Sequence, residues 1–205
     1  AGVRDRVLRG LLGGHGLGNF NAMKLWLVRH ARPLIDSGVC YGALDVPADD
    51  AATRSCAAQL ASTLPIQGSG PVSMSTSPLQ RCELLTQYLC GLRPDLAPVS
   101  DADLAEMNFG SWEGRRWDAI GEESLARWTD QFATHRPGGG ESVQEFMRRV
   151  EAAMSRLQGD DAVWITHAGV IRAATFIAGG LRILASADQW PVNGPGYGET
   201  VLLEM

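Results

Sequence analysis

The chain has 205 residues, of which 45% are hydrophobic and 20% are charged. This composition is typical of a folded globular protein with a sizeable core and excludes a disordered chain. The formal net charge of -5 argues against nucleic acid as a partner. The most apolar stretch, 162–185, is too interrupted by charged residues to predict a membrane span.

Residues 1–22 differ from the rest of the sequence. They are rich in glycine and arginine, follow no helix or strand period, and lack the long apolar core of a signal peptide. The first apolar run starts directly after Met23. We therefore expect 1–22 to be a leader or a non-native, disordered extension, and 23–205 to form a single domain.

Two apolar runs, each followed by a helical pattern, come first in this domain. The run at 24–28 is short and continuous, which is typical of a strand buried on both faces, and 49–63 is alanine-rich and predicts a helix. The segment 72–76 predicts a second strand. The sequence SPLQ at 77–80 then has the form of a capping box, with its serine as N-cap, and opens a helix that runs to about Cys90.

The second half of the domain continues this alternation. In chain order we expect a helix at 118–132, a second capping-box helix at 142–158, a strand at 162–166, a helix at 169–178 and a last strand at 200–203. Strands that alternate with helices predict an α/β fold, here a three-layer α/β/α sandwich with a largely parallel central sheet.

The cysteines and histidines are scattered along the chain. No cysteine belongs to a C-x-x-C pair, and a chain with this core does not need disulfides. We expect Cys40, Cys56, Cys82 and Cys90 to be free thiols in a reducing, cytoplasmic setting. Because the histidines are far apart in the sequence, no zinc site is predicted.

Polar side chains follow three of the predicted strands. Arg29 and His30 follow 24–28, Arg81 comes shortly after 72–76, and His167 follows 162–166. Ligand sites in open α/β sheets form at the carboxyl ends of strands, so we expect these four side chains to converge on one pocket. Two arginines, two histidines and nearby helix N-termini suit a dianion, and phosphate is the natural candidate.

Each of these residues also has an ordinary structural interpretation. A lone histidine at a strand end is more often hydrogen-bonded than functional, and Arg29 alone is more often a surface charge. Arg81 could be solvated or paired with Glu83 or Asp95. The conjunction of four such groups at three strand ends favours the phosphate site.

Five stretches of the sequence resemble, in order, the motifs of the histidine phosphatase superfamily, also called the phosphoglycerate mutase-like family. They are LVRHARP at 27–33, TSPLQRC at 76–82, EMNFGSWEG at 106–114, the glycine-rich stretch at 137–142 and THAGVIRA at 166–173. The resemblance covers the chain from Met23 onward. It implies the α/β/α fold of that family and a phosphatase activity.

The resemblance also implies roles for single residues. His30 would be the nucleophile and form a phosphohistidine, for which it must be neutral; its unperturbed pKa is about 6.5. Arg29, Arg81 and His167 would hold the phosphoryl oxygens. Glu106 would protonate the leaving alkoxide and then help water to attack, and Glu113 in the same motif is the rival acid. No metal and no other cofactor is expected, because arginines supply the positive charge.

The first motif departs from the commonest family form, R-H-G-E-T-x-x-N. Pro33 and Asp36 stand where threonine and asparagine would add donors to the phosphate. A carboxylate beside a dianion would be repelled, so we expect Asp36 to turn away. Arg32 either replaces a lost contact or lies in solvent.

The acid motif and the chain length favour hydrolysis over mutase action. The strings LWLVRHARP, CYG-x-L-D-V-P and L-x-EMNFG-x-WEG resemble α-ribazole phosphatases, which release phosphate from α-ribazole 5′-phosphate or adenosylcobalamin 5′-phosphate in cobalamin synthesis. Tyr41, Gly42 and Trp112 could then form a rim on which a flat base stacks. For Trp112, packing in the core is an equal alternative.

Other functions stay open at this point. They are a broad-specificity metabolite phosphatase, a phosphoglycerate mutase-like enzyme, a protein phosphohistidine phosphatase and a non-catalytic phosphate-binding regulatory module. The partner common to the metabolite interpretations is a small phosphate monoester, with neither nucleic acid nor membrane involved.

Overall fold

The structure is a computed structural model that describes residues 7–9, 23–64, 72–191 and 193–205. Most of 1–22 therefore lies outside the described residues, and the expectation of a disordered extension stays a prediction. The exception is Val7–Arg9, whose backbone forms a short strand, β1, beside the last strand of the sheet.

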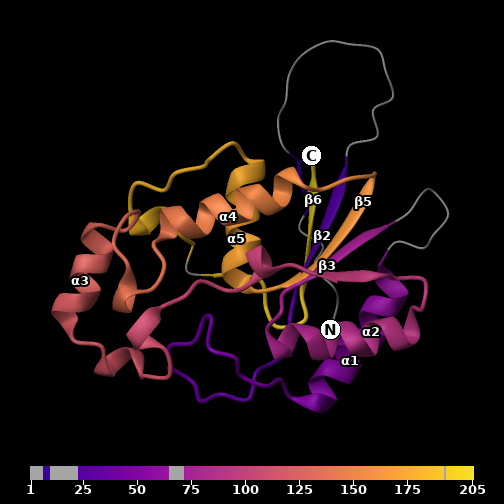
Figure 1. Ribbon diagram of the computed structural model, residues 1–205, viewed down its shortest axis with the longest axis horizontal. Helices are drawn as coiled ribbons and strands as arrows, with labels where there is room; N and C mark the ends of the chain where they lie inside the picture. Colours follow the sequence, from indigo (N-terminus) through magenta and orange to yellow (C-terminus); the bar gives the residue numbers. More distant parts are fainter. Residues whose placement is uncertain (1–6, 10–22, 65–71, 192) are drawn as a thin grey trace, which may run out of the picture.

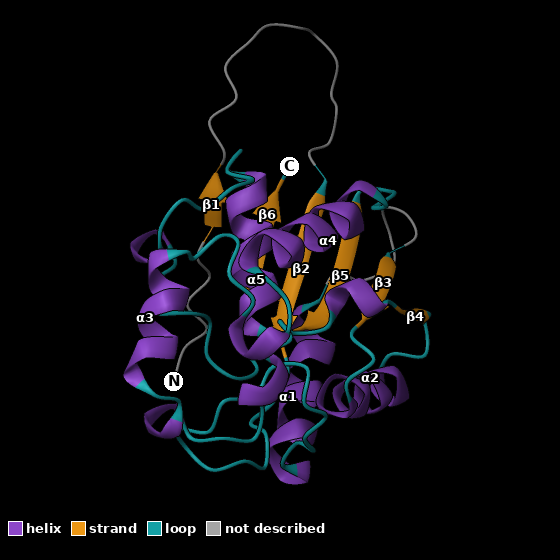
Figure 2. Cartoon of the chain, turned by 60° about the vertical axis from the view of Figure 1, so that its left-hand side comes forward, coloured by secondary structure: helices purple, strands orange, loops and turns teal. Residues whose placement is uncertain are grey.

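One mixed sheet forms the centre of the described chain (Figure 2). Its strands lie in the order β1-β6-β2-β5-β3-β4. β2, β5, β3 and β4 are parallel, and β6 runs antiparallel to β2. After β1, the strands in chain order are β2 (Lys24–Arg29), β3 (Ser73–Thr76), β4 (Pro98–Ser100), β5 (Asp161–Thr166) and β6 (Thr200–Glu204). The expected largely parallel sheet is confirmed.

Helices cover both faces of this sheet (Figure 1). α1 and α2 pack together on one face, and α4 and α5 pack on the other. α3 lies apart from the sheet, beyond α4. The five helices of the described chain are α1 (Asp50–Thr63), α2 (Gln80–Leu92), α3 (Glu122–Asp130), α4 (Val143–Ser155) and α5 (Ala168–Ala178). The three-layer sandwich predicted from the sequence is confirmed.

Alternate residues of β5 pack into two different hydrophobic cores, one on each face of the sheet. Ala162 and Trp164 belong to the core under α4 and α5, whereas Val163 and Ile165 belong to the core under α1 and α2. Alternate residues of a strand point to opposite faces, so a strand between two helix layers must be apolar on both sides. This is why 162–166 is an unbroken apolar run.

The observed elements differ from the predicted ones at two helix starts. Ser77 is not a helix cap: α2 begins at Gln80 with Leu79 at the N-cap, and Asp45 Oδ1 accepts from the Gln80 amide at 2.8 Å. The helix expected at 118–132 is divided into a short 3₁₀ turn (Trp117–Ala119) and α3. The second capping box is confirmed, with Ser142 at the N-cap and Glu145 bonding back to it.

Candidate active site

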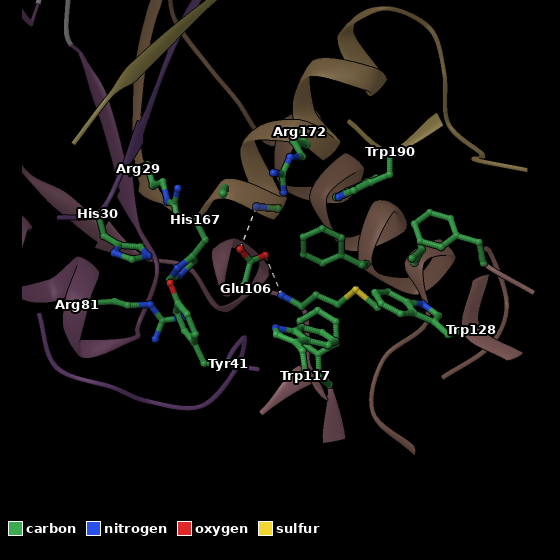
Figure 3. A pocket seen from close by; sticks show the side chains of 17 residues that line it. Arg29, His30, Tyr41, Arg81, Glu106, Trp117, Trp128, His167, Arg172 and Trp190 are labelled. Carbon is green, nitrogen blue, oxygen red and sulfur yellow. Dashed lines mark hydrogen bonds between the residues drawn. The ribbon is translucent and has the colours of Figure 1, made fainter. Parts of the chain in front are cut away.

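The carboxyl ends of β2, β5 and β3 meet at one edge of the sheet. In the ladder Arg29 pairs with Thr166, and Thr76 pairs with Ile165, so the residues that follow each strand lie side by side. A cavity of about 250 Å³ opens there, and Arg29, His30, Arg81, Glu106 and His167 all line it (Figure 3). The convergence predicted from three strand ends is thus present in the structure.

His30 leaves the end of β2 and is only 2% exposed. Its Nδ1 lies 2.6 Å from the carbonyl oxygen of Ala31. A carbonyl only accepts, so Nδ1 carries the proton and Nε2 keeps its lone pair. Burial, and then the charges of Arg81 and Arg29, lower the pKa of His30 to about 3 although the Ala31 bond opposes them. The imidazole is therefore neutral at pH 7.

His167 is the N-cap residue of α5 and is fully buried. Its Nε2 lies 2.8 Å from the hydroxyl of Ser77, and its ring centroid is 5.1 Å from that of His30. Burial lowers the pKa of His167 well below the usual value, and the neighbouring His30 and Arg81 lower it further. The hydroxyl that sequence reasoning assigned to a helix cap thus contacts the second histidine of the cavity.

Arg81, in the first turn of α2, is fully buried. Its Nη1 donates to the carbonyl of Leu44 at 2.9 Å and its Nη2 to the carbonyl of Gly42 at 2.6 Å, rather than to Glu83 or Asp95. Neutral acceptors leave the guanidinium charge uncompensated at close range. The alternatives of a solvated or ion-paired Arg81 are therefore wrong.

Arg29 enters the cavity from the last position of β2. Its Nη1 donates to the carbonyl of Pro195 at 2.7 Å, and its guanidinium carbon lies 3.8 Å from the centre of the Tyr197 ring. Among the described residues, the Nε–H groups of Arg29 and Arg81 are buried and have no hydrogen-bond partner. Both guanidinium groups donate to neutral carbonyl oxygens, so their positive charge suits an anionic ligand.

The two rival glutamates occupy different places. Glu106 lines the cavity, where its Oε2 accepts from the Gly169 amide at 2.9 Å and its Oε1 from the Met107 amide at 3.1 Å (Figure 3). A side chain at Gly169 would overlap the Glu106 carboxylate. Glu113 lies outside this cavity. Its carboxylate accepts hydrogen bonds from backbone amides, including that of Gly42.

The expected rim is only partly present. Tyr41 lines the cavity, and its hydroxyl lies 2.9 Å from that of Tyr197. Gly42 is behind the cavity, where it holds Arg81 through its carbonyl and where a side chain would overlap the carbonyl oxygen of Met107. Trp112 is buried in a small core with Cys40 and Ile120, so its placement at the rim is wrong.

Two residues of the altered part of the first motif, Arg32 and Asp36, lie away from the cavity. Arg32 lies on the surface with its side chain 66% exposed, and its Nη2 is 3.2 Å from Asp49 Oδ2. Of the two alternatives for Arg32, the position in solvent is therefore the correct one. Asp36 lies in the surface loop that lines a neighbouring hollow, which shares Tyr41 with the cavity. Neither residue belongs to the set that lines the main cavity.

An aromatic wall, which sequence reasoning missed, forms the other half of the cavity. Trp117 and Trp128 are nearly parallel, with an angle of 10° and ring centroids 6.3 Å apart. The aromatic residues that line this half are Phe109, Trp117, Trp128, Phe132, Phe146 and Trp190. They come from segments far apart in the sequence, and none stands beside a predicted strand end. Arg172 of α5 also lines the cavity.

Three further features of the described chain bear on its chemistry. All four cysteines are free thiols. No three His, Cys, Asp or Glu side chains among the described residues are grouped so that they could hold a metal ion. Of the helices described, none has the length and apolar character needed to cross a membrane.

The chain matches a known protein family over most of its length. The model of the histidine phosphatase superfamily (branch 1) matches residues 25–190. Among solved structures, the protein TTHB049 from Thermus thermophilus is similar at a TM-score of 0.65 and 28% identity, over 88% of this chain and 92% of that one. A mycobacterial glucosyl-3-phosphoglycerate phosphatase has a TM-score of 0.72 at 21% identity, over 88% and 89% of the chains, a likeness of fold alone.

Curated relatives match a shorter part of the chain. The adenosylcobalamin/alpha-ribazole phosphatase of Salmonella typhimurium is 32% identical over 95 residues, which are 43% of this chain and 46% of that protein. The metal-independent phosphoserine phosphatase of Arabidopsis thaliana is 29% identical over 114 residues, 50% of this chain and 47% of that protein. The matches thus span about half the length of these relatives.

Proposed function

The chain belongs to branch 1 of the histidine phosphatase superfamily, and on that premise we propose that it is a phosphomonoesterase that works through a phosphohistidine on His30. One observation carries the proposal. A neutral, buried histidine shares a cavity with two arginines that donate to neutral carbonyl oxygens and with one carboxylate, Glu106. These are the groups that phosphoryl transfer to nitrogen requires.

In the first step the lone pair on His30 Nε2 forms a bond to phosphorus as the ester P–O bond breaks. Arg29, Arg81 and His167 hold the phosphoryl oxygens and stabilise the charge that these oxygens carry in the transition state. Glu106, in its protonated form, gives its proton to the leaving alkoxide oxygen, and the alcohol departs.

In the second step the ionised Glu106 takes a proton from water as the water oxygen attacks phosphorus. The N–P bond breaks, the electron pair returns to His30 Nε2, and inorganic phosphate is released. The chain is then restored, with His30 neutral and Glu106 protonated. Positive charge is supplied by the two arginines, so turnover is expected to be unchanged by EDTA.

We further propose α-ribazole 5′-phosphate as the substrate, in the cytoplasm and in cobalamin biosynthesis. Two observations support this finer proposal: the aromatic wall beside the charged residues, against which a flat base can stack, and the similarity to a Salmonella protein whose name includes alpha-ribazole phosphatase.

Phosphate release from a panel of monoesters in the presence of EDTA tests both levels of the proposal. The panel contains α-ribazole 5′-phosphate, phosphoserine, 3-phosphoglycerate and p-nitrophenyl phosphate. A strong preference for α-ribazole 5′-phosphate is expected. Even, weak release from all four would support a broad-specificity phosphatase and contradict the substrate. No release from any would favour the regulatory module and contradict the enzyme.

A further inference from the structure

Glu113 lies outside the cavity, yet its carboxylate accepts four backbone hydrogen bonds. Oε2 accepts from the amides of Gly42 at 2.9 Å and Leu44 at 2.8 Å, and Oε1 accepts from those of Ala43 at 3.0 Å and Phe109 at 2.9 Å. Three successive amides that point at one anion form a backbone nest. The carboxylate therefore fixes the backbone of 42–44 at each of its residues.

Two carbonyls of the same loop hold Arg81. The peptide group between Gly42 and Ala43 bonds at both ends, since its N–H donates to Glu113 and its C=O accepts from Arg81 Nη2 at 2.6 Å. The carbonyl of Leu44 accepts from Nη1 at 2.9 Å. A peptide that lies between a carboxylate and a guanidinium is polarised by both, and this strengthens each bond.

We infer that Glu113 is a positioning residue that sets the guanidinium of Arg81 at the phosphate site through the backbone of 42–44. The inference rests on the proposed function, because it concerns the arginine that would hold the phosphoryl group. Arg81 is fully buried and both of its terminal nitrogens end on this loop, so a shift of the loop must shift the guanidinium.

The local structure explains why a carboxylate at this position can reach the loop. Two backbone bonds join the segments: the Cys40 amide donates to the carbonyl of Arg115 at 2.7 Å, and the Gly114 amide donates to that of Cys40 at 2.8 Å. Gly114 has a φ of 78°, a conformation that glycine adopts without strain. This turn brings the Glu113 side chain under the amides of 42–44.

The fourth donor extends the role of Glu113 to the other half of the cavity. The amide of Phe109 belongs to a residue whose ring contacts Trp117 and Trp128 edge-on, with centroids 5.5 and 5.8 Å away. One carboxylate thus ties the loop that holds Arg81 to the start of the aromatic wall.

A double-mutant cycle on phosphate binding tests the inference. Inorganic phosphate is titrated by calorimetry into the wild-type chain, Glu113→Gln, Arg81→Lys and the double variant. In Glu113→Gln the side-chain NH₂ replaces one carboxylate oxygen and, being a donor, cannot accept from the backbone amides. This variant is expected to raise the Kd for phosphate about tenfold. In the Arg81→Lys background the same change is expected to raise the Kd less than about twofold, because the residue it positions is gone.

The control is Glu123→Gln, the same substitution on the exposed face of α3, which should leave the Kd unchanged. Circular dichroism reports whether each variant folds. If Glu113→Gln does not fold, Glu113→Asp replaces it. The aspartate side chain is shorter by one methylene, so its carboxylate lies farther from the amides of 42–44, and the Kd should rise only when Arg81 is present. An unchanged Kd, or an equal rise in both backgrounds, would overturn the inference.

Turnover, measured in parallel, separates this inference from the proposed function. One outcome is that residues 113 and 81 are coupled in phosphate binding but the chain hydrolyses no ester. This would contradict the proposed phosphatase activity and support the positioning role of Glu113. Turnover with no coupling would contradict the positioning role alone. A wild-type chain that does not bind phosphate would overturn both.

Discussion

The two halves of the cavity are built in different ways. The charged half is built around the ends of adjacent strands, with Arg81 in the first turn of the helix after β3. His30, Arg81 and His167 are at most 2% exposed. The aromatic half comes from turns and helices outside the sheet; Phe132 and Phe146 are buried, but Trp117 and Trp128 are only half-buried. The sheet fixes the groups that would carry out phosphoryl transfer, while the less buried cover would select the alcohol. Substitutions in the two halves should therefore affect different kinetic constants.

The largest effect is expected from the centre of the charged half. His30→Ala removes the nucleophile, and turnover should fall by ~10⁴-fold or more for every ester, whatever its alcohol. The measurement is the steady-state rate with p-nitrophenyl phosphate and with α-ribazole 5′-phosphate. His135→Ala, outside the cavity, should keep its rate. Wild-type rates in His30→Ala would show that His30 takes no part in the reaction.

The next largest effect is expected at Glu106, which stands between the two halves. Glu106→Gln should lower kcat by about 10²- to 10³-fold for alkyl esters, whose alkoxide needs a proton to leave. The first step with p-nitrophenyl phosphate needs no proton, so there the phosphoenzyme should accumulate and give a burst of p-nitrophenol. Glu122→Gln on α3 is the matched control. Equal losses in kcat/KM, which reports the steps up to departure of the alcohol, for the two kinds of ester would contradict the role as acid.

A smaller and selective effect is expected in the aromatic half. Trp128→Ala should raise KM about tenfold for α-ribazole 5′-phosphate, because base–aromatic stacking contributes about 1–3 kcal/mol. KM for phosphoserine should change much less, and Trp128→Phe, which keeps a ring, should retain most of the affinity. A parallel rise in KM for both esters would mean that the wall does not select the alcohol.

The last expected effect concerns stability rather than turnover, and it again distinguishes the charged half. His30 and His167 are held neutral, His30 with a pKa of about 3, whereas the unfolded histidines bind protons below about pH 6.5. The unfolded state therefore binds more protons as the pH falls, and the free energy of unfolding should drop by up to about 1.4 kcal/mol per pH unit and histidine between about pH 6.5 and 5.

Urea unfolding at pH 7, 6 and 5 measures this dependence. The His30→Asn variant lacks one of the two buried imidazoles. Its free energy of unfolding should therefore fall less steeply as the pH falls, with a slope smaller by the contribution of about one proton. A slope equal to that of the wild-type chain would show that His30 is not kept neutral by the fold.

The charged half could be predicted from the sequence, and the aromatic half could not. Arg29, His30 and His167 each adjoin an apolar run, so the strand ends alone bring them together. Trp117 and Trp128 meet because the expected long helix is interrupted at Gly121, and Trp190 comes from a segment with no clear period. Such contacts depend on tertiary packing and leave no local signal.

The assignments of Ser77 and Gly42 differ from the structure because each residue bonds to a partner distant in the sequence. Ser77 fits the capping-box pattern, but a loop carboxylate, Asp45, binds the start of α2 and leaves the serine hydroxyl for His167. Gly42 was expected to contact the substrate, whereas the structure places it behind Arg81. In both cases the decisive partner is distant in sequence, so spacing within the motif could not reveal it.

The central claim is tested most directly by trapping the phosphorylated chain. The Glu106→Gln variant is mixed with p-nitrophenyl phosphate, quenched at alkaline pH, which preserves phosphohistidine, and digested for mass spectrometry. The prediction is one phosphoryl group on the peptide that contains His30, absent from a Glu106→Gln, His30→Ala control. Phosphate on another residue, or p-nitrophenol release with no phosphoryl group on the chain, would contradict it.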